Sequence, residues 1–275
     1  MMKNKMLGIP YFVWMLLFIV LPIVILVFYA CTKTVDGSLI FSLENLKNCF
    51  SPKYLKIYWD SIYLAAVSTI ICLIIGYPFA YFISRMKPKY RSIFLIFIML
   101  PTWMNFLLRT YSWMNILGKN GIVNKLIEMI GLSPMNLLYN ESAVLLGMVY
   151  NFLPFMIYPI YSILVKIKSA YIDAAMDLGA TPFKSFYKIT LPLSVPGIIT
   201  GITMVFMPAV STFVITDLLG GGQKMFIGNL IQHQFIQKGD WNFGSALSII
   251  MMAIILIAMK FMNKFDTTDD KESAL

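Results

Sequence analysis

The chain has 275 residues, of which 59% are hydrophobic and only 13% charged, and its formal net charge is +9. A soluble domain carries about a quarter charged residues, so this composition excludes a water-soluble globular protein. A lysine and arginine excess in a membrane protein usually lies in cytoplasmic loops and does not by itself indicate nucleic-acid binding. A single histidine and three cysteines argue against a His-rich metal site and a disulfide framework.

Apolar stretches of about 20 residues, long enough to cross a bilayer as a helix, recur along the chain. They are Ile9–Ala30, Ser61–Ile83, Ile93–Met114, Ala143–Val165, Leu193–Thr216 and Trp241–Met262. Spanning β-strands would be about 10 residues long with alternating polarity, which these stretches lack. The sequence therefore predicts an all-α, polytopic membrane protein with six transmembrane helices.

The first stretch is expected to stay in the protein as a membrane helix. Lys3 and Lys5 precede it, as in a signal peptide, but its apolar part is longer than a signal peptide needs and no small-residue cleavage site follows. Cys31 and Cys49 would then share the first outer loop, where two free thiols are expected rather than a disulfide.

The distribution of lysine and arginine predicts the orientation of the chain. Four of these residues are packed between Arg85 and Arg91, in the loop after the second stretch, and the loops on the same side are richer in positive charge than the longer loops opposite. Positive loops stay in the cytoplasm. Both termini are therefore expected to be cytoplasmic.

The inner segment 166–192 is patterned as two short helices. Ser169 can cap the first, and Gly179 can end it. Thr181 and Pro182 fit the cap and first position of a second helix, which Pro192 is expected to end.

Aromatic residues mark one face of the second of these helices. Phe183, Phe186 and Tyr187 fall three and four positions apart, which places them together as a ridge. Such a ridge could insert into a groove on another protein or lie on the lipid surface, and the pattern leaves both open.

A longer motif in this segment resembles the EAA loop of type-I ABC importer permeases. Asp173-Ala174-Ala175-Met176-Asp177-Leu178-Gly179 is followed, after nine residues, by Ile189-Thr190-Leu191-Pro192. Asp173 stands where the family usually has Glu. The resemblance implies that the loop docks into an ATP-binding subunit through the following residues: Asp173, Ala174, Ala175, Gly179, Phe183, Phe186, Ile189, Leu191 and Pro192.

Further stretches, from about residue 55 to 260, are similar to the permease subunits of spermidine/putrescine importers. They include Leu100–Trp103, Arg109–Tyr111, Leu153–Met156, Asp217–Gly221 and Asp240–Gly244. The resemblance implies an N-terminal helix and outer loop over 1–54, a permease core over 55–262 with its coupling loop at 166–192, and a cytoplasmic tail over 263–275.

The same resemblance implies a set of partners and a mechanism. A second permease subunit would share the membrane, two ATP-binding subunits would lie inside, and a substrate-binding protein would deliver substrate outside by an alternating-access cycle. The sequence has no G-x-x-x-x-G-K-[ST] loop, so ATP and Mg²⁺ are expected on the partner, with no cofactor or metal on this chain and no enzymatic activity of its own.

Candidate residues for a substrate path are the polar and aromatic groups within or beside the predicted spans. A polyamine needs carboxylates and aromatic faces, which makes Asp217, Trp103 and Tyr111 candidates. Arg109 lies deep in a stretch, with Asn105 one turn before it on the same face. A structural or gating role is expected for Arg109, because a basic side chain suits a cation path poorly.

Three other functions remain as alternatives. Another importer substrate, such as an oxyanion, ferric iron or thiamine, would keep the coupling loop. A channel that works without ATP would not depend on that loop. A membrane-embedded enzyme would require a reactive cluster that the sequence does not display.

Overall fold

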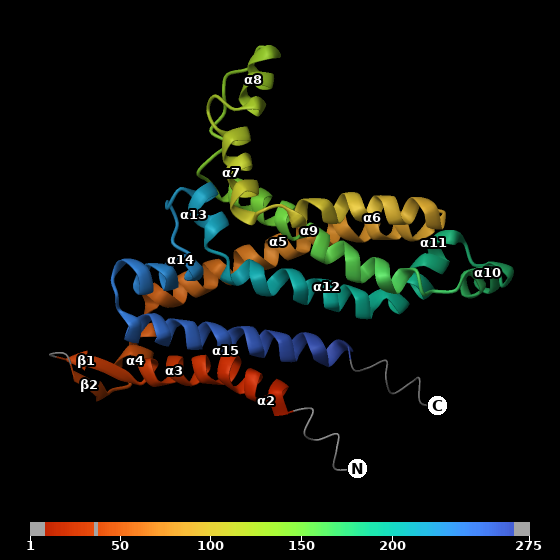
Figure 1. The fold of residues 1–275 in the computed structure, drawn as a ribbon. Helices are drawn as coiled ribbons and strands as arrows, with labels where there is room; N and C mark the ends of the chain where they lie inside the picture. The colour runs from red at the N-terminus through yellow and green to blue at the C-terminus, as the bar shows by residue number, and fades with distance from the viewer. Residues whose placement is uncertain (1–8, 36–37, 267–275) are drawn as a thin grey trace, which may run out of the picture. The chain divides into compact units, whose positions relative to one another are not determined.

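The computed structural model describes residues 9–35 and 38–266, which form helices with one short hairpin (Figure 1). The chain divides into two compact units. Unit 1 comprises the chain up to Trp59 together with Ile227–Leu256, and unit 2 comprises Asp60–Phe226 together with the segment from Ile257 onward. Lys3 and Lys5, and the tail predicted for 263–275 beyond Asp266, lie outside the described residues.

Helices long and apolar enough to cross a membrane agree with the predicted count. Among the described residues five helices qualify, or six if a bent pair of helices is taken as one span. The qualifying segments are Pro10–Ala30 in α2 (Ile9–Met15), η1 (Leu16–Val20) and α3 (Leu21–Ala30); α5 (Pro52–Arg85); α9 (Glu141–Leu164); Pro182–Ser211 in α11 (Pro182–Ser185), η2 (Phe186–Thr190) and α12 (Leu191–Ser211); and Trp241–Met262 in α15 (Trp241–Asp266).

The third predicted stretch, Ile93–Met114, is not one helix. α6 (Pro88–Trp103) ends within this stretch and α7 (Phe106–Leu117) begins two residues later. The chain bends by 92° between the two helices. The side chain of Asn105 accepts hydrogen bonds from the N–H groups of Leu107 and Leu108, at 2.9 and 3.3 Å. Asn105 thus caps a new helix, a local bond that competes with continuation of the old one.

The fifth stretch also ends differently from the prediction of Leu193–Thr216. α12 stops at Ser211, and a separate short helix, α13 (Val214–Gly220), follows the break at Thr212 and Phe213. Like the bend after α6, this break leaves polar residues at the ends of helices and not in the middle of a membrane span.

The structure adds a hairpin that the sequence analysis missed. In unit 1, β1 (Thr32–Val35) pairs antiparallel with β2 (Ser38–Phe41), with Thr32 opposite Phe41. Asn242 holds the hairpin to the start of α15: its Nδ2 donates to the carbonyl oxygens of Tyr29 and Thr32, at 3.1 and 2.8 Å, and its Oδ1 accepts from the hydroxyl of Thr34 at 2.8 Å.

The remaining elements of unit 1 are the short helices α4 (Glu44–Cys49) and α14 (Ile227–Gln232) and the π-turn η3 (His233–Gln237). Cys31, Cys49 and Cys72 all carry free thiols, as expected for the first two. Burial raises the pKa of Cys49 to about 11, so its thiol stays protonated at neutral pH.

Unit 2 is organised around α9, the most buried of the candidate spans. Unit 2 also contains the short helices α8 (Ile122–Met129) and α10 (Ser169–Asp177). In Figure 1, α9 and α12 run alongside each other, with α10 and α11 at one end and α13 at the other. α9 supplies large buried side chains such as Met148, Met156 and Ile160 to this core.

Glycines on α12 bring its backbone close to α9. A Cβ added to Gly197 would lie 3.0 Å from the carbonyl oxygen of Pro159 and 3.1 Å from Cα of Ile160. One added to Gly201 would lie 2.8 Å from the sulfur of Met156 and 3.2 Å from the carbonyl oxygen of the same residue. Gly197 and Gly201 form a G-x-x-x-G pattern, which permits this backbone contact in membrane helices.

A larger side chain at this contact should separate α12 from α9. We expect Gly197→Leu to lower stability by about 1–3 kcal/mol, because the added side chain meets backbone atoms that cannot rotate away. Thr200→Leu is the matched control, since Thr200 is exposed on the same helix. Thermal unfolding of the purified protein in detergent measures both, and equal melting temperatures for the two variants would contradict the packing.

Candidate coupling surface and transport path

A tight turn joins the two short helices of segment 166–192. Gly179 has a φ of +81°, its N–H donates to the carbonyl of Met176 at 2.9 Å, and the N–H of Ala180 donates to the carbonyl of Ala175 at 2.9 Å. This pair of bonds is the Schellman motif that ends many helices at a glycine. The predicted role of Gly179 at the helix end is therefore confirmed.

The second helix begins as predicted. Thr181 caps α11, with its hydroxyl accepting from the N–H of Lys184 at 3.3 Å, and Pro182 takes the first position. The cap predicted for the first helix is wrong: α10 starts with Ser169 itself, after Lys168, and Ser169 makes no capping bond.

The aromatic ridge divides into two parts. Phe183 is 78% exposed and Tyr187 is also exposed, while Leu178 beside the turn is 89% exposed. Phe186 instead packs edge-to-face on α5, with its ring centroid 6.0 Å from that of Tyr77 and 5.2 Å from that of Tyr81. One part of the ridge is thus free to bind a partner, and the other part connects the loop to a membrane helix.

Pro192 does not end the second helix, contrary to the prediction. The N–H of Leu191 donates to the carbonyl of Phe186, five residues earlier, so the helix widens into the π-turn η2 just before the proline. The wider turn makes room for the proline ring and its missing N–H. Residues Pro182–Ser211 therefore form one continuous helix that begins just after the Gly179 turn and runs alongside α9.

The other residues expected in the coupling loop lie along the same two helices. Asp173 and Ala174 are exposed on α10, whereas Ala175 is half-buried. Ile189 and Leu191 are half-buried and Pro192 is exposed where η2 joins α12. We define the coupling surface as the exposed residues Asp173, Ala174, Leu178, Gly179, Phe183 and Tyr187.

Arg109, on α7, is buried and bound to the bend. It is 7% exposed, its Nη1 donates to the carbonyl of Pro101 on α6, and its guanidinium lies 5.9 Å from the ring centroid of Phe106 and 6.0 Å from that of Tyr150. The charge thus meets a helix C-terminus and two aromatic faces, which are the favourable surroundings for a buried cation.

The other candidates from the same region point outward. Asn105 is exposed and serves as the cap of α7, and Trp103, the last residue of α6, is 78% exposed. Tyr111 is exposed on α7, and Asp217 is exposed on α13. The structure packs α7 against α13, so Tyr111 and Asp217 lie on neighbouring helices.

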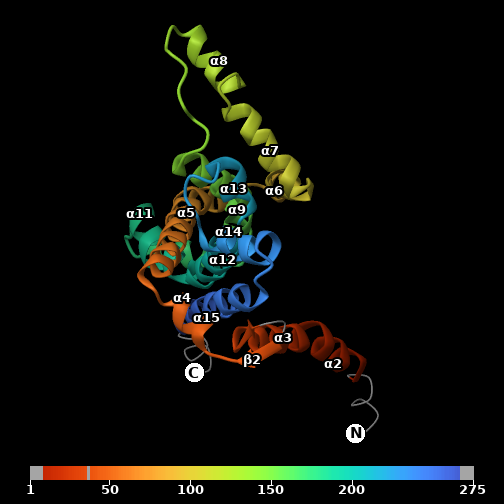
Figure 2. The same ribbon diagram turned by 90° about the vertical axis from the view of Figure 1, so that its left-hand side faces the viewer.

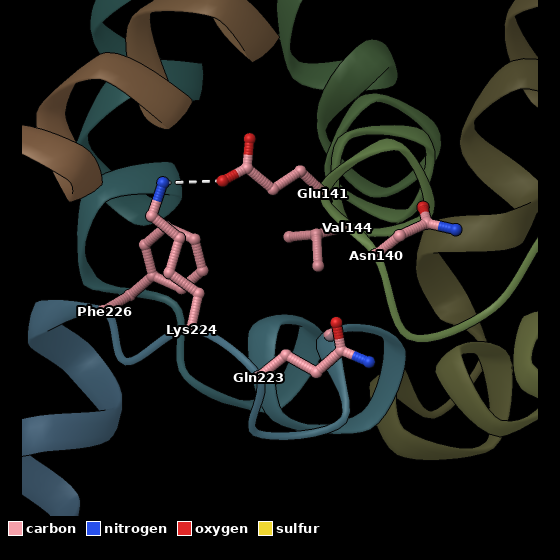
Figure 3. Close-up of a pocket in the computed structure, with 7 residues that line it drawn as sticks. Asn140, Glu141, Val144, Gln223, Lys224 and Phe226 are labelled. Atoms are coloured by element: carbon pink, nitrogen blue, oxygen red, sulfur yellow. Dashed lines mark hydrogen bonds and ion pairs between the residues drawn. The ribbon is translucent and has the colours of Figure 1, made fainter.

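Sequence reasoning missed a pocket of about 220 Å³ in unit 2, at the end of α9 away from the coupling surface (Figure 3). Lys224 reaches across it to the carboxylate of Glu141 and lies 3.6 Å from that of Asp60. The hydrogen bond that Lys224 donates to Glu141 and the negative charges of Asp60 and Glu141 raise the pKa of Lys224. Phe226 lies beside it, with its ring centroid 5.8 Å from Nζ.

Asn151 is a second feature that the sequence analysis passed over. It is 1% exposed in the middle of α9, and its Nδ2 donates to the carbonyl of Gly147 at 2.7 Å. Its Oδ1 has no hydrogen-bond partner among the described residues. A lone amide in an apolar helix would have been the signal for it, since buried polar groups in membranes mark functional sites.

Removing Arg109 should loosen the bend between α6 and α7. Arg109→Met leaves the carbonyl of Pro101 without this donor, and an unsatisfied buried acceptor costs about 1–3 kcal/mol. In Arg109→Met, the distance between spin labels on α6 and α8, measured by double electron–electron resonance, should have a broader distribution than in the parent protein. The control is Arg91→Met, because Arg91 lies near the start of α6, outside the bend, where its Nε donates to the carbonyl of Met86. An unchanged distribution in Arg109→Met would contradict the anchoring role.

Comparison with known proteins identifies the family of this chain. Residues 73–267 match the family described as binding-protein-dependent transport system inner membrane component. The spermidine/putrescine transport system permease protein PotB of Haemophilus influenzae is 40% identical over 262 residues, which cover 92% of this chain and 91% of the relative. PotB of Escherichia coli (strain K12) is 35% identical, with 91% and 96% covered.

A solved structure supports the same fold. A bacterial ABC transporter involved in the import of the acidic polysaccharide alginate contains a chain that superimposes with a TM-score of 0.82 at 18% identity, covering 97% of this chain and 95% of the other. At this identity the likeness concerns the fold alone. The family match and the PotB relatives show that this chain belongs to the inner-membrane permease components of binding-protein-dependent transport systems.

Proposed function

We propose that this permease subunit carries spermidine or putrescine across the plasma membrane of a bacterium in an ATP-driven importer. The observation that carries the proposal is the 40% identity to a spermidine/putrescine permease over 92% of the chain. Identity of this extent covers the helices, the coupling surface and the loops at the opposite end together. It therefore favours a shared substrate as well as a shared fold.

The charges of the described residues suit a cationic substrate. Asp217 is exposed at the end of unit 2 opposite the coupling surface, where Asp60 and Glu141 also lie. The guanidinium of Arg109 is buried and bound to the Pro101 carbonyl, so its side chain is held away from solvent. An ammonium group entering from that end would meet carboxylates first, and exposed aromatic residues such as Tyr111 would offer cation–π contacts.

The coupling surface supports a separate ATP-binding partner. Leu178 and Phe183, on either side of the Gly179 turn, expose large apolar side chains, and burying each in a partner groove would contribute about 2 kcal/mol. The continuous helix Pro182–Ser211 would transmit movement of that partner directly into the core. Phe186 would transmit it to α5 through Tyr77 and Tyr81.

The full complex proposed here has four kinds of subunit. This chain would pair with a second, PotC-like permease and bind two PotA-like ATPase subunits, which would hold ATP and Mg²⁺. A PotD-like binding protein would deliver substrate to the surface around Lys224 and the segment Gly220–Asp240. Both termini would then be cytoplasmic, on the side of Arg85, whose guanidinium lies 5.2 Å from the ring centroid of Tyr81 near the coupling surface.

Substrate identity is tested by ATP hydrolysis. The purified complex in lipid discs, with its binding protein, is assayed with spermidine, putrescine, sulfate, ferric iron and thiamine. We expect stimulation by a polyamine alone. Stimulation by another solute would contradict the polyamine proposal and retain the coupling surface. If no ATPase subunit co-purifies, the coupling proposal is wrong.

The coupling surface is tested at its turn. Gly179→Val forces a β-branched residue into a φ of +81°, at a cost of about 1–2 kcal/mol, and should distort the turn that presents Leu178 and Phe183. We expect uptake and co-purification of the ATPase subunit to be lost while the permease still inserts.

The matched control for this variant is Gly131→Val. Gly131 also has a φ of +81°, and like Gly179 it has no atom within 4 Å of an added Cβ, so the backbone strain is equal. Gly131 follows α8, away from the coupling surface. Loss of the ATPase subunit in both variants would show general misfolding and contradict a specific role for the Gly179 turn.

A further inference from the structure

Helix α8 presents an apolar face that nothing else in the described chain covers. Ile122, Leu126 and Met129 are 63%, 57% and 80% exposed, and their spacing of four and three residues places them on one side of the helix. Glu128 is exposed away from this side, while Lys125, three residues after Ile122 and four before Met129, is exposed at its edge. An amphipathic helix whose apolar side faces outward needs an apolar surface to cover it.

The opposite side of α8 is held by its own connecting loop. Asn124 is 1% exposed; its Nδ2 donates to the carbonyls of Gly118 and Met135, both at 3.1 Å, and its Oδ1 accepts from the N–H of Met135 at 2.9 Å. This clamp folds the segment after α8 back beneath it, leaving Val123 and Ile127 half-buried. The clamp therefore fixes which side of the helix faces outward.

The lipid bilayer is the occupant that the surroundings favour. α8 continues from α7, and the helical segment Phe106–Met129 qualifies as a membrane span only together with α6. α7 itself exposes Leu107 and Leu108, so a lipid-facing apolar surface leads up to α8. Figures 1 and 2 show α7 and α8 projecting sideways from α6 and α9, which is the direction of the bilayer plane if α9 crosses it.

Charge in and around α8 agrees with a lipid surface. Lys119 precedes the helix and Lys125 lies within it, both exposed, where they can contact phospholipid phosphates while the apolar residues enter the acyl chains. We propose that α8 is an interfacial anchor: Ile122, Leu126 and Met129 insert into the bilayer leaflet opposite the coupling surface and hold α7 at its angle to α6.

The test measures the depth of single side chains in the assembled importer. Leu126→Cys, Met129→Cys and Glu128→Cys are each labelled with bimane in a Cys31→Ser background. Cys49 and Cys72 are buried and stay in place, and the parent without an added cysteine gives the background labelling. The complex is reconstituted in phosphatidylethanolamine and phosphatidylglycerol discs with and without brominated acyl chains.

We expect brominated chains to quench bimane at 126 and 129 about twofold and to leave position 128, on the polar side, nearly unchanged. Equal quenching at 126 and 128 would contradict an oriented interfacial helix. Weak quenching at 126 and 129, with crosslinking of the same cysteines to the second permease subunit, would show that a protein covers this face and would overturn the proposal.

Discussion

The close approach of α12 to α9 positions the features that unit 2 presents at both its ends. Gly197 and Gly201 let the two backbones touch near Pro159 and Met156, a contact that any larger residue would separate. Because α12 is continuous with η2 and α11, this one packing contact also places the coupling surface. Because α13 packs on α9 and α7, it places Asp217 at the other end as well.

Backbone hydrogen bonding governs where helices break and where they continue. A bilayer offers no water to carbonyl or N–H groups, so each interruption must satisfy its own ends. At the end of α6 this is done by the guanidinium of Arg109 and the cap of Asn105. Before Pro192 it is done by a π-turn instead, and the helix goes on. The cap and the guanidinium stabilise a bend in the chain, whereas the π-turn keeps Pro182–Ser211 one continuous helix.

These two solutions have different mechanical uses. In the proposed importer, the helix Pro182–Ser211 would carry a displacement of the coupling surface into the core, and the contact of Phe186 with Tyr77 and Tyr81 would pass part of it to α5. A bend stabilised by a buried cation resists displacement. An importer that alternates between two states requires elements that move and elements against which they move.

The sequence alone determined the class of protein, most of its membrane spans and the turn at Gly179. Composition and the length of apolar stretches identify membrane helices because the bilayer requires both. Gly179 and the Thr181–Pro182 pair were interpreted correctly because helix ends depend on bonds between residues a few positions apart. The resemblance to importer permeases rested on the same local motifs.

Only the tertiary structure decided which prolines interrupt a helix, where Phe186 points and which carboxylates hold Lys224. Pro101 and Pro192 look alike in sequence, yet one lies beside a bend and the other in a continuous helix. Lys224 and Glu141 are 83 positions apart, and no local pattern relates them. Such pairings depend on how packed helices bring distant residues together, which periodicity and capping rules do not encode.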